Sequence, residues 1–297
     1  MPTFLPHAPH CAVQLPRQAG TRHPWIPAAA VLAAALFCSG QAMAQLMVHP
    51  TRVVLENNQR SAQLEIINNS DKPTVYRISL VNRRMDEMGG FSPIEAALPG
   101  EQFVDDMVRY SPRRVSLAPG ASQIIRVMAR KPADLAVGEY RSHLLFAEQE
   151  DAAARSAAAS SRSGEIGVSL TALVGVSIPV IVRHGTTSAE VSLSRLALEM
   201  SADGATPVLS MEMSRSGNRS VHGDLAVDFV PAGGGASITV GRAGGVAVYT
   251  PNLLRQVRLP LLISPGAART GGSLHVSYRE PPERGGALLA EAALPVR

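Results

Sequence analysis

Side chains that could carry catalysis or hold a metal ion are scattered through the sequence. Beyond residue 44 the histidines stand singly, with no His-x-x-x-His pair and no acid at ligand spacing; they are His49, His143, His184, His222 and His275. There is no Gly-x-Ser-x-Gly turn and no phosphate-binding glycine loop. Asp105 and Asp106 are adjacent, so a strand would point them to opposite faces. We therefore expect no enzyme, no metal site and no cofactor.

The run from Val168 to Val182 (VSLTALVGVSIPVIV) could act through its backbone instead. Its apolar residues stand at alternate positions, so an extended chain puts them on one face; they are Val168, Leu170, Ala172, Val174 and Val176. An edge strand with unpaired amides and one apolar face can join the sheet of another chain. The alternative is an ordinary sandwich strand whose apolar face is buried in its own domain.

The composition predicts a globular protein large enough to position such a strand. The chain has 297 residues, of which 45% are hydrophobic and 18% charged, which suits one large or two medium domains. Its formal net charge is +4, and arginine supplies most of the positive charge because the only lysines are Lys72 and Lys131. Removal of an N-terminal signal peptide that contains Arg17 and Arg22 would lower this charge to +2, which is too small to indicate binding to nucleic acid.

Residues 1–44 have the pattern of a secretory signal peptide. Arg17 and Arg22 precede a nearly uniform apolar run over 25–37, and small residues around Ala42-Met43-Ala44 offer a cleavage site. A membrane anchor is the alternative, but the apolar run is shorter than the roughly 20 residues that cross a bilayer. Both cysteines, Cys11 and Cys38, fall in this segment. We expect an exported mature protein without disulfides.

The rest of the chain reads as short strands separated by turn signals. Alternating or β-branched runs recur about every 8 to 12 residues, with Asn, Gly and Pro clusters between them, as in a β-sandwich. In the first half these runs are Met47–Leu55, Ser61–Ile67, Thr74–Val81, Arg114–Leu117, Ser122–Ala129 and Tyr140–Glu148. In the second half they are Ala189–Leu198, Pro207–Met213, Gly223–Val230, Gly245–Tyr249, Gln256–Ile263, Ser273–Tyr278 and Ala287–Leu294.

Two interruptions divide this pattern into domains. Residues 149–167 (QEDAAARSAAASSRSGEIG) are small and polar, which indicates a flexible loop. The apolar strand 168–182 follows, and Arg183-His184-Gly185 is a hinge. We expect an N-terminal domain over 45–184 and a C-terminal domain over 185–297.

Several segments resemble the periplasmic pilus chaperones of the chaperone-usher pathway. The resemblance covers nearly the whole first domain and rests on YSPRRVSLAPG at 110–120, GEYRSHLLF at 138–146 and the strand from Val168 to Arg183. The ending SIPVIVR at 177–183 is similar to the archaic branch. The second domain fits by strand count and position only.

The resemblance implies an all-β protein of two immunoglobulin-like β-sandwich domains in an L shape. Its function would be that of a periplasmic chaperone, which binds pilin subunits by donor-strand complementation and delivers them to an outer-membrane usher. The donors would be Val168, Leu170, Ala172, Val174 and Val176, and an unloaded donor strand could also pair with a second copy. No cofactor and no nucleic acid would be involved.

The resemblance also implies a basic anchor for the subunit's C-terminal carboxylate. Arg52 stands where the family places one such arginine, although a solvated charge protecting an edge strand is an equally simple explanation. The second basic residue of the P-pilus type falls near Pro179, which cannot serve. Arg141 and His143, which share one face of the preceding strand, are the substitutes.

A salt bridge between or beside the domains is a further implication. Glu139 and Arg183 match positions at which the family places it, and Glu283 or Glu280 would complete it. A structural role is expected, because removing one member of a buried pair costs roughly 3 to 5 kcal/mol.

A secreted adhesion or binding module built from the same sandwiches is the rival function. In such a protein the apolar strand would be core, and a surface ligand would bind through loops. A chaperone would instead lose its subunit when Leu170 and Val174 become charged.

Overall fold

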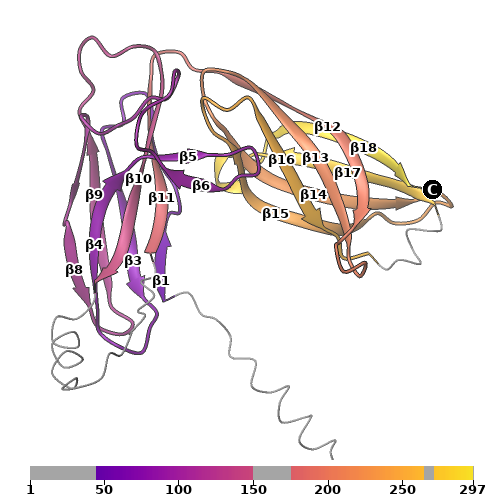
Figure 1. Cartoon of the computed structure of the whole chain (residues 1–297), viewed down its shortest axis with the longest axis horizontal. Helices are drawn as coiled ribbons and strands as arrows, with labels where there is room; N and C mark the ends of the chain where they lie inside the picture. Colours follow the sequence, from indigo (N-terminus) through magenta and orange to yellow (C-terminus); the bar gives the residue numbers. More distant parts are fainter. Residues whose placement is uncertain (1–44, 150–174, 264–270, 297) are drawn as a thin grey trace, which may run out of the picture. The chain divides into compact units, whose positions relative to one another are not determined.

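The computed structural model describes residues 45–149, 175–263 and 271–296 (Figure 1). Ala44–Arg297 form one compact unit. Strands make up nearly all of the regular structure, and the described residues contain one helix, the 3₁₀ turn η1 (Pro282–Arg284). None of their helices is long and apolar enough to cross a membrane. The all-β fold predicted from the sequence is therefore confirmed.

The first sandwich is built from two sheets. One has the strand order β1-β3-β9-β7, and the other has the order β2-β11-β10-β4-β8. Their bounds are β1 Leu46–His49, β2 Val53–Leu55, β3 Ser61–Asn68, β4 Thr74–Val81, β7 Val108–Ser111, β8 Arg114–Leu117, β9 Ser122–Ala129, β10 Gly138–Gln149 and β11 Gly175–His184.

This topology is that of an immunoglobulin-like domain. In that fold the strands A, B, E and D form one sheet and C, F and G the other. With β1, β3, β4, β7, β9, β10 and β11 taken as A to G, both sheets have this order. The extra strands β2 and β8 extend the second sheet at its two ends, where β2 runs parallel to β11.

The second sandwich has the same plan. Its sheets have the orders β12-β13-β16 and β15-β14-β17-β18. The difference from the first sandwich is that its fourth strand, β15, pairs with its third strand, β14, and so belongs to the other sheet. The bounds are β12 Ala189–Met200, β13 Pro207–Gly217, β14 Val221–Pro231, β15 Ile238–Val248, β16 Leu254–Pro260, β17 Gly272–Arg279 and β18 Leu288–Val296.

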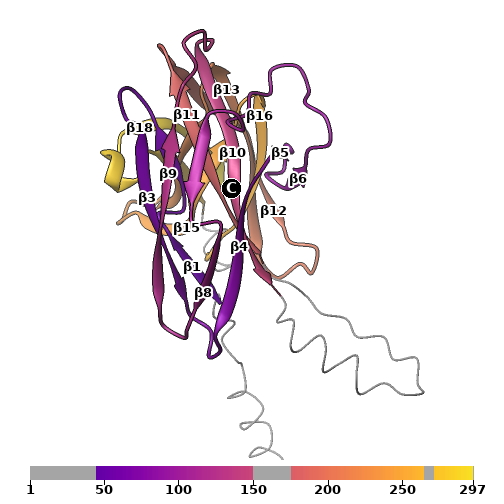
Figure 2. The same ribbon diagram turned by 90° about the vertical axis from the view of Figure 1, so that its left-hand side faces the viewer.

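A separate hairpin, β5 (Arg83–Met85) with β6 (Phe91–Pro93), follows β4. Figures 1 and 2 show it projecting away from the two sheets of the first sandwich. Its turn contains Gly89, whose φ of +87° favours glycine. The sequence Met88-Gly89-Gly90 is one of the glycine clusters that indicate a turn, but the two strands of the hairpin are too short to show an alternating pattern.

Strand positions follow the hydrophobic alternation closely where one face is buried. The predicted runs Thr74–Val81, Arg114–Leu117 and Ser122–Ala129 coincide with β4, β8 and β9. In β9 the residues Ile125, Val127 and Ala129 are buried while those between them are exposed. A shift of one residue would expose this apolar set, so the pattern fixes the register.

The prediction of one strand over Met47–Leu55 is wrong. The structure has two short strands here, and they belong to different sheets: β1 pairs with β3, and β2 pairs with β11. Pro50 lies at the break and has no backbone N–H for a ladder. The chain therefore crosses from one sheet to the other between His49 and Val53, and Arg52 lies in this crossing segment.

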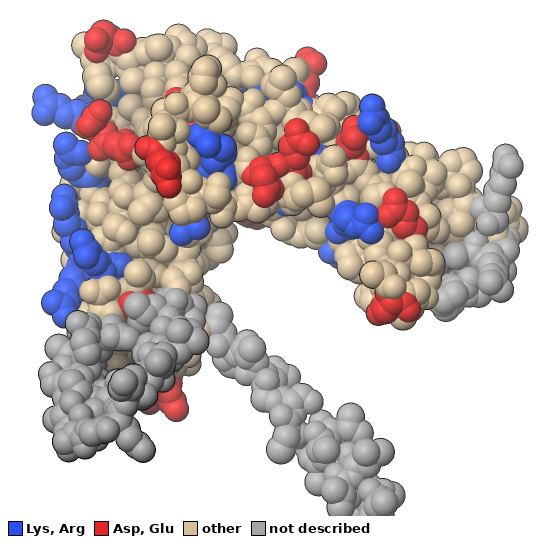
Figure 3. Space-filling view, viewed as in Figure 1, with Lys and Arg blue, Asp and Glu red and all other residues tan. Residues whose placement is uncertain are grey.

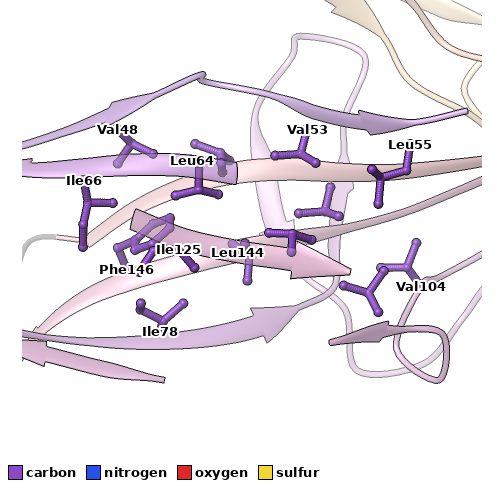
Figure 4. Packing of buried hydrophobic residues seen from close by; sticks show 14 of the residues in the cluster. Val48, Val53, Leu55, Leu64, Ile66, Ile78, Val104, Ile125, Leu144 and Phe146 are labelled. Atoms are coloured by element: carbon purple, nitrogen blue, oxygen red, sulfur yellow. The ribbon is translucent and has the colours of Figure 1, made fainter. Parts of the chain in front are cut away.

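Aliphatic side chains from both sheets fill the core of the first sandwich. Figure 4 shows Val48, Leu64, Ile66 and Ile125 from one sheet meeting Phe146 and its neighbours from the other. All five are buried, and each contributes about 1.5 to 3 kcal/mol relative to exposure. This packing holds β10 rigidly and fixes which of its side chains point away from the core.

Three predicted segments lie wholly or mostly outside the described residues. These are the signal peptide at 1–44, the loop at 149–167 apart from Gln149, which ends β10, and the first part of the donor strand, 168–174.

Candidate functional site

The outward face of β10 is buried although it carries charge. Tyr140, Leu144 and Phe146 point into the core, so period two directs Glu139, Arg141 and His143 to the opposite side. These three polar side chains are only 2%, 6% and 3% exposed. Charged residues are rarely buried unless they are paired, so this face is a candidate functional site.

Arg52 reaches the same place from the link between β1 and β2. Its Nη1 donates a hydrogen bond to the hydroxyl of Tyr249 at 3.1 Å, and its Cζ lies 5.3 Å from the centre of that ring. The guanidinium of Arg141 lies 4.4 Å from the same ring centre. Tyr249 follows β15 and is buried. Two of the three anchor residues predicted from the sequence, Arg52 and Arg141, therefore gather around one aromatic ring.

The hairpin β5–β6 supplies a second ring. Phe91 packs edge-on against His143 with ring centres 5.2 Å apart, and it lies 5.9 Å from Tyr249. The guanidinium of Arg141 lies 6.0 Å from the centre of Phe91. We call the set Arg52, Arg83, Phe91, Arg141, His143 and Tyr249 the cationic cluster.

Some buried nitrogen atoms of the cationic cluster make no hydrogen bond to the described residues. Several of its buried nitrogen atoms have no acceptor among the described residues; they are Nε and Nη2 of Arg52, Nε of Arg83, Nε and Nη1 of Arg141, and Nδ1 of His143. The buried hydroxyl of Ser177 on β11 and Nε of Arg255 on β16 share this state. An unmet buried donor is costly, more so when it is charged, and an anion would satisfy these groups.

The charges of the cluster act on one another. Burial, together with repulsion from Arg141, Arg83 and Arg52, lowers the pKa of His143 to about 3. Burial also lowers the pKa of Arg141, against the opposing influence of Tyr249 and Glu139. His143 is therefore neutral near pH 7, and the positive charge resides on the arginines.

Glu139 and Arg183 form a second, fully paired group. Arg183 Nε donates to Glu139 at 2.9 Å, and its Nη1 donates to Glu56 at 2.8 Å. Burial alone would lower the pKa of Arg183, but the two carboxylates outweigh it and raise the pKa. Glu139 also accepts hydrogen bonds from the backbone N–H and hydroxyl of Ser220 in the second sandwich.

The third acid of this group differs from the one expected. Glu283 lies in η1, where no residue is buried, and neither Glu283 nor Glu280 makes an ion pair among the described residues. Glu56 takes that place because it follows β2 directly and so lies beside the end of β11. Arg284, next to Glu283, joins the group through Glu56 at 3.2 Å.

The described part of the predicted donor strand is β11. Of the five predicted donors, Val176 is half-buried and packs against the first core, opposite Phe146. Val168, Leu170, Ala172 and Val174 lie outside the described residues. On the other side of β11, β2 pairs only with Val180–Val182. No described strand pairs with that side of Gly175–Pro179.

The cationic cluster lies beside this part of β11. Pro179 is opposite His143 in the β10–β11 ladder, and Ile181 is opposite Arg141. Pro179 itself provides no cation, and the strand beside it carries Arg141 and His143 on the face of the cluster. Arg52 also lines a cavity of about 390 Å³ together with Arg183, Arg219, Ser220, His222 and Arg284.

Arginines on β4, β8 and β9 of the first sandwich are exposed to solvent, unlike the buried nitrogen atoms of the cluster. Figure 3 shows positive side chains along its outer edge, where β4, β8 and β9 lie. Arg77, Arg114 and Arg126 on these strands are exposed. Their N–H groups are open to solvent, and on β8, an edge strand of its sheet, such a charge opposes pairing with other chains. The buried arginines of the cluster have no such access.

Arg83, Phe91 and Tyr249 were not predicted from the sequence. Arg83 and Phe91 lie in the unrecognised hairpin, and Tyr249 is 108 positions beyond Arg141, in the other sandwich. Local periodicity contains no information on such a contact. Asp105 and Asp106 are in a turn rather than on a strand, and Asp105 accepts a hydrogen bond from Asn82 at 2.6 Å.

No family model and no curated protein matches the sequence. The fold is similar to solved structures of fimbrial chaperones. One is the Escherichia coli chaperone DraB, with 12% identity, coverage of 85% of this chain and 96% of that one, and a TM-score of 0.41. Another is Pseudomonas aeruginosa CupB2, with 12% identity, 84% and 99% coverage, and a TM-score of 0.38.

A third similar structure is a chain of the CsuC–CsuE complex, described as a chaperone and tip adhesion subunit from the archaic Csu pili of Acinetobacter baumannii. It shares 10% identity, with 85% of this chain and 98% of that one covered and a TM-score of 0.40.

Proposed function

We propose that this protein is a periplasmic chaperone that binds fimbrial subunits by strand addition and delivers them to an outer-membrane usher. The observation that carries the proposal is the position of the cationic cluster beside Gly175–Pro179, the part of the β11 edge that no described strand pairs. A strand edge offers backbone pairing to an extended chain, and buried cations beside it offer an anchor for that chain's carboxylate.

The strand contribution comes from alternate apolar residues on one face. Val168, Leu170, Ala172 and Val174 would fill the open core groove of an incomplete subunit, whereas Val176, at the start of β11, packs against the first core. Burying each large aliphatic side chain would contribute about 1.5 to 3 kcal/mol, and ladder hydrogen bonds would add to this. Such a complex needs no nucleotide to form, and a competing strand at the usher would release the subunit.

The anchor contribution comes from Arg52, Arg141 and His143. A carboxylate can accept two parallel hydrogen bonds from one guanidinium, which fixes orientation as well as affinity. Because pairing by one residue out of step reverses every side chain, a fixed chain end would set the register of the added strand. The cluster would therefore decide which subunit residues face which donors.

Periplasmic co-expression with a panel of fimbrial subunits tests the proposal. We expect a subunit that is insoluble alone to become soluble in a one-to-one complex with the wild-type chain. The double variant Leu170→Asp, Val174→Asp should lose the complex, because burying two carboxylates in an apolar groove is unfavourable.

The matched control is Ile124→Asp on β9, which changes an exposed aliphatic residue away from β11. It should retain the complex. Equal recovery of complex with the double variant and the wild type would rule out strand donation. A folded wild-type chain that solubilises no subunit but binds a surface ligand would favour the rival function, a secreted adhesion module.

A further inference from the structure

Tyr249 contacts two arginines of the cationic cluster, Arg52 and Arg141. Its ring lies within cation–π distance of the guanidinium groups of Arg52 and Arg141, at 5.3 and 4.4 Å. Its hydroxyl accepts the hydrogen bond of Arg52 Nη1. Arg52 and Arg141 repel each other, and the electron-rich ring partly offsets this repulsion.

Phe91 extends this aromatic surface from the hairpin. It contacts Tyr249, His143 and the guanidinium of Arg141 at ring distances near 6 Å or less. The hairpin is itself held by the second sandwich: Asn252 Nδ2 donates to the carbonyl of Met85 at 2.7 Å, and the amide of Gln256 donates to the carbonyl of Glu87 at 2.7 Å. The backbone of the hairpin that carries Phe91 is therefore tied to the second sandwich.

A ring over the face of a guanidinium leaves the in-plane N–H groups available. Nε and Nη1 of Arg141 and Nε of Arg52 are buried donors without an acceptor among the described residues. A planar carboxylate can lie in the plane of a guanidinium and accept from two such donors. A tetrahedral oxyanion would direct an oxygen out of that plane, toward the rings.

We propose that Tyr249 and Phe91 are positioning residues that make the cationic cluster selective for planar carboxylates over tetrahedral oxyanions. This inference rests on the proposed function, in which the cluster anchors the carboxylate of a bound subunit. The inference adds a contribution from the second sandwich: the cations of the anchor belong to the first sandwich, and Tyr249 of the second sandwich positions them.

Titration of the purified mature chain with three small probes tests the selectivity. Acetate, methylphosphonate and acetamide have the same methyl group but differ in shape and charge. Arginine Nε–H signals in ¹H–¹⁵N spectra report binding, with assignment by Arg52→Lys and Arg141→Lys. In the wild type we expect acetate to bind about tenfold more tightly than methylphosphonate, and acetamide to have no effect.

Tyr249→Leu should reduce this preference to about twofold or less, because the guanidinium faces become accessible. Tyr249→Phe keeps the ring and loses only the hydroxyl, so it should restore the preference. Tyr110→Leu is the matched control, since Tyr110 also lies under an arginine, Arg113 at 5.6 Å, but outside the cluster. This variant should retain the wild-type preference.

The possible results separate the two proposals. An unchanged acetate preference in Tyr249→Leu would overturn the role of the rings and leave the anchor intact. A wild-type chain whose arginine signals do not respond to acetate would overturn the anchor and this inference with it. If Tyr249→Leu does not fold, Phe91→Leu gives the same test, because the Phe91 side chain is 42% exposed and its loss should be tolerated.

Discussion

Arg141 and His143 are buried cationic or basic residues whose neighbours are also basic. Burial of unpaired charge opposes folding, and a chain normally avoids it or supplies an acid. The nearby Glu139 is already engaged by Arg183 and Ser220. The rings of Phe91 and Tyr249 offset only part of the cost. The unpaired charges of the cluster destabilise the free chain, and an anion that paired with them would remove this cost and so bind more tightly.

His143 should make the fold sensitive to acid. Its pKa is about 3 in the folded chain against 6.5 for the ordinary group, so the unfolded chain binds more protons between these values. Stability should therefore fall as the pH drops from 6.5 toward 3, by up to about 1.4 kcal/mol per pH unit. Urea unfolding of wild type and His143→Asn at pH 7 and pH 5 measures this loss.

The variant His143→Asn should lose less stability between pH 7 and pH 5 than the wild type does. His275→Asn is the control, because His275 is an exposed imidazole on β17, and it should follow the wild type. His222, whose pKa burial and Arg52 lower to about 4, will leave some acid sensitivity in either variant. Identical pH dependence in His143→Asn and the wild type would contradict the assignment.

At the scale of elements, the edge of β11 should change on complex formation. Every other amide of Gly175–Ile178 points to the side without a described strand partner, while the rest pair with β10. In the free chain these outward amides should exchange with solvent rapidly. In a subunit complex they should become protected, which hydrogen exchange followed by mass spectrometry or NMR can measure.

The amides of Val180–Val182 are the internal control for that experiment. They already lie between β10 and β2, so their protection should change little when a subunit binds. Protection that appears at a loop but not at Gly175–Ile178 would indicate a ligand bound in the manner of an adhesin. Strand addition would then be excluded as the mode of binding.

Elements with one buried face could be predicted from the sequence, and the others could not. The alternation in β4 and β9 reflects burial directly, so their bounds were predicted to the residue. The strand exchange around Pro50 and the hairpin β5–β6 depend on pairing partners that local periodicity does not reveal. Arg52, Arg141 and His143 could be selected as site residues, but their contact with Tyr249 depends on the packing of two sandwiches.

At the scale of the whole molecule, polar contacts rather than a large shared core connect the two sandwiches. Each sandwich has its own apolar cluster, and a small one links them through Met85, Ile181, Ala247 and Tyr249. Glu139 adds a polar connection, because it pairs with Arg183 in the first sandwich and accepts from Ser220 in the second. The cluster and this connection lie on the same face of β10.

Removing the charge of Glu139 should weaken the fold and this connection together. Glu139→Gln leaves Arg183 buried with only the half-exposed Glu56 as its acid partner, and loss of one member of a buried pair costs about 3 to 5 kcal/mol. Urea unfolding at pH 7 measures the change. Glu199→Gln, which breaks the exposed pair with Arg258, is the matched control and should cost less than about 1 kcal/mol. If the two variants lose equal stability, Glu139 has no structural role between the sandwiches.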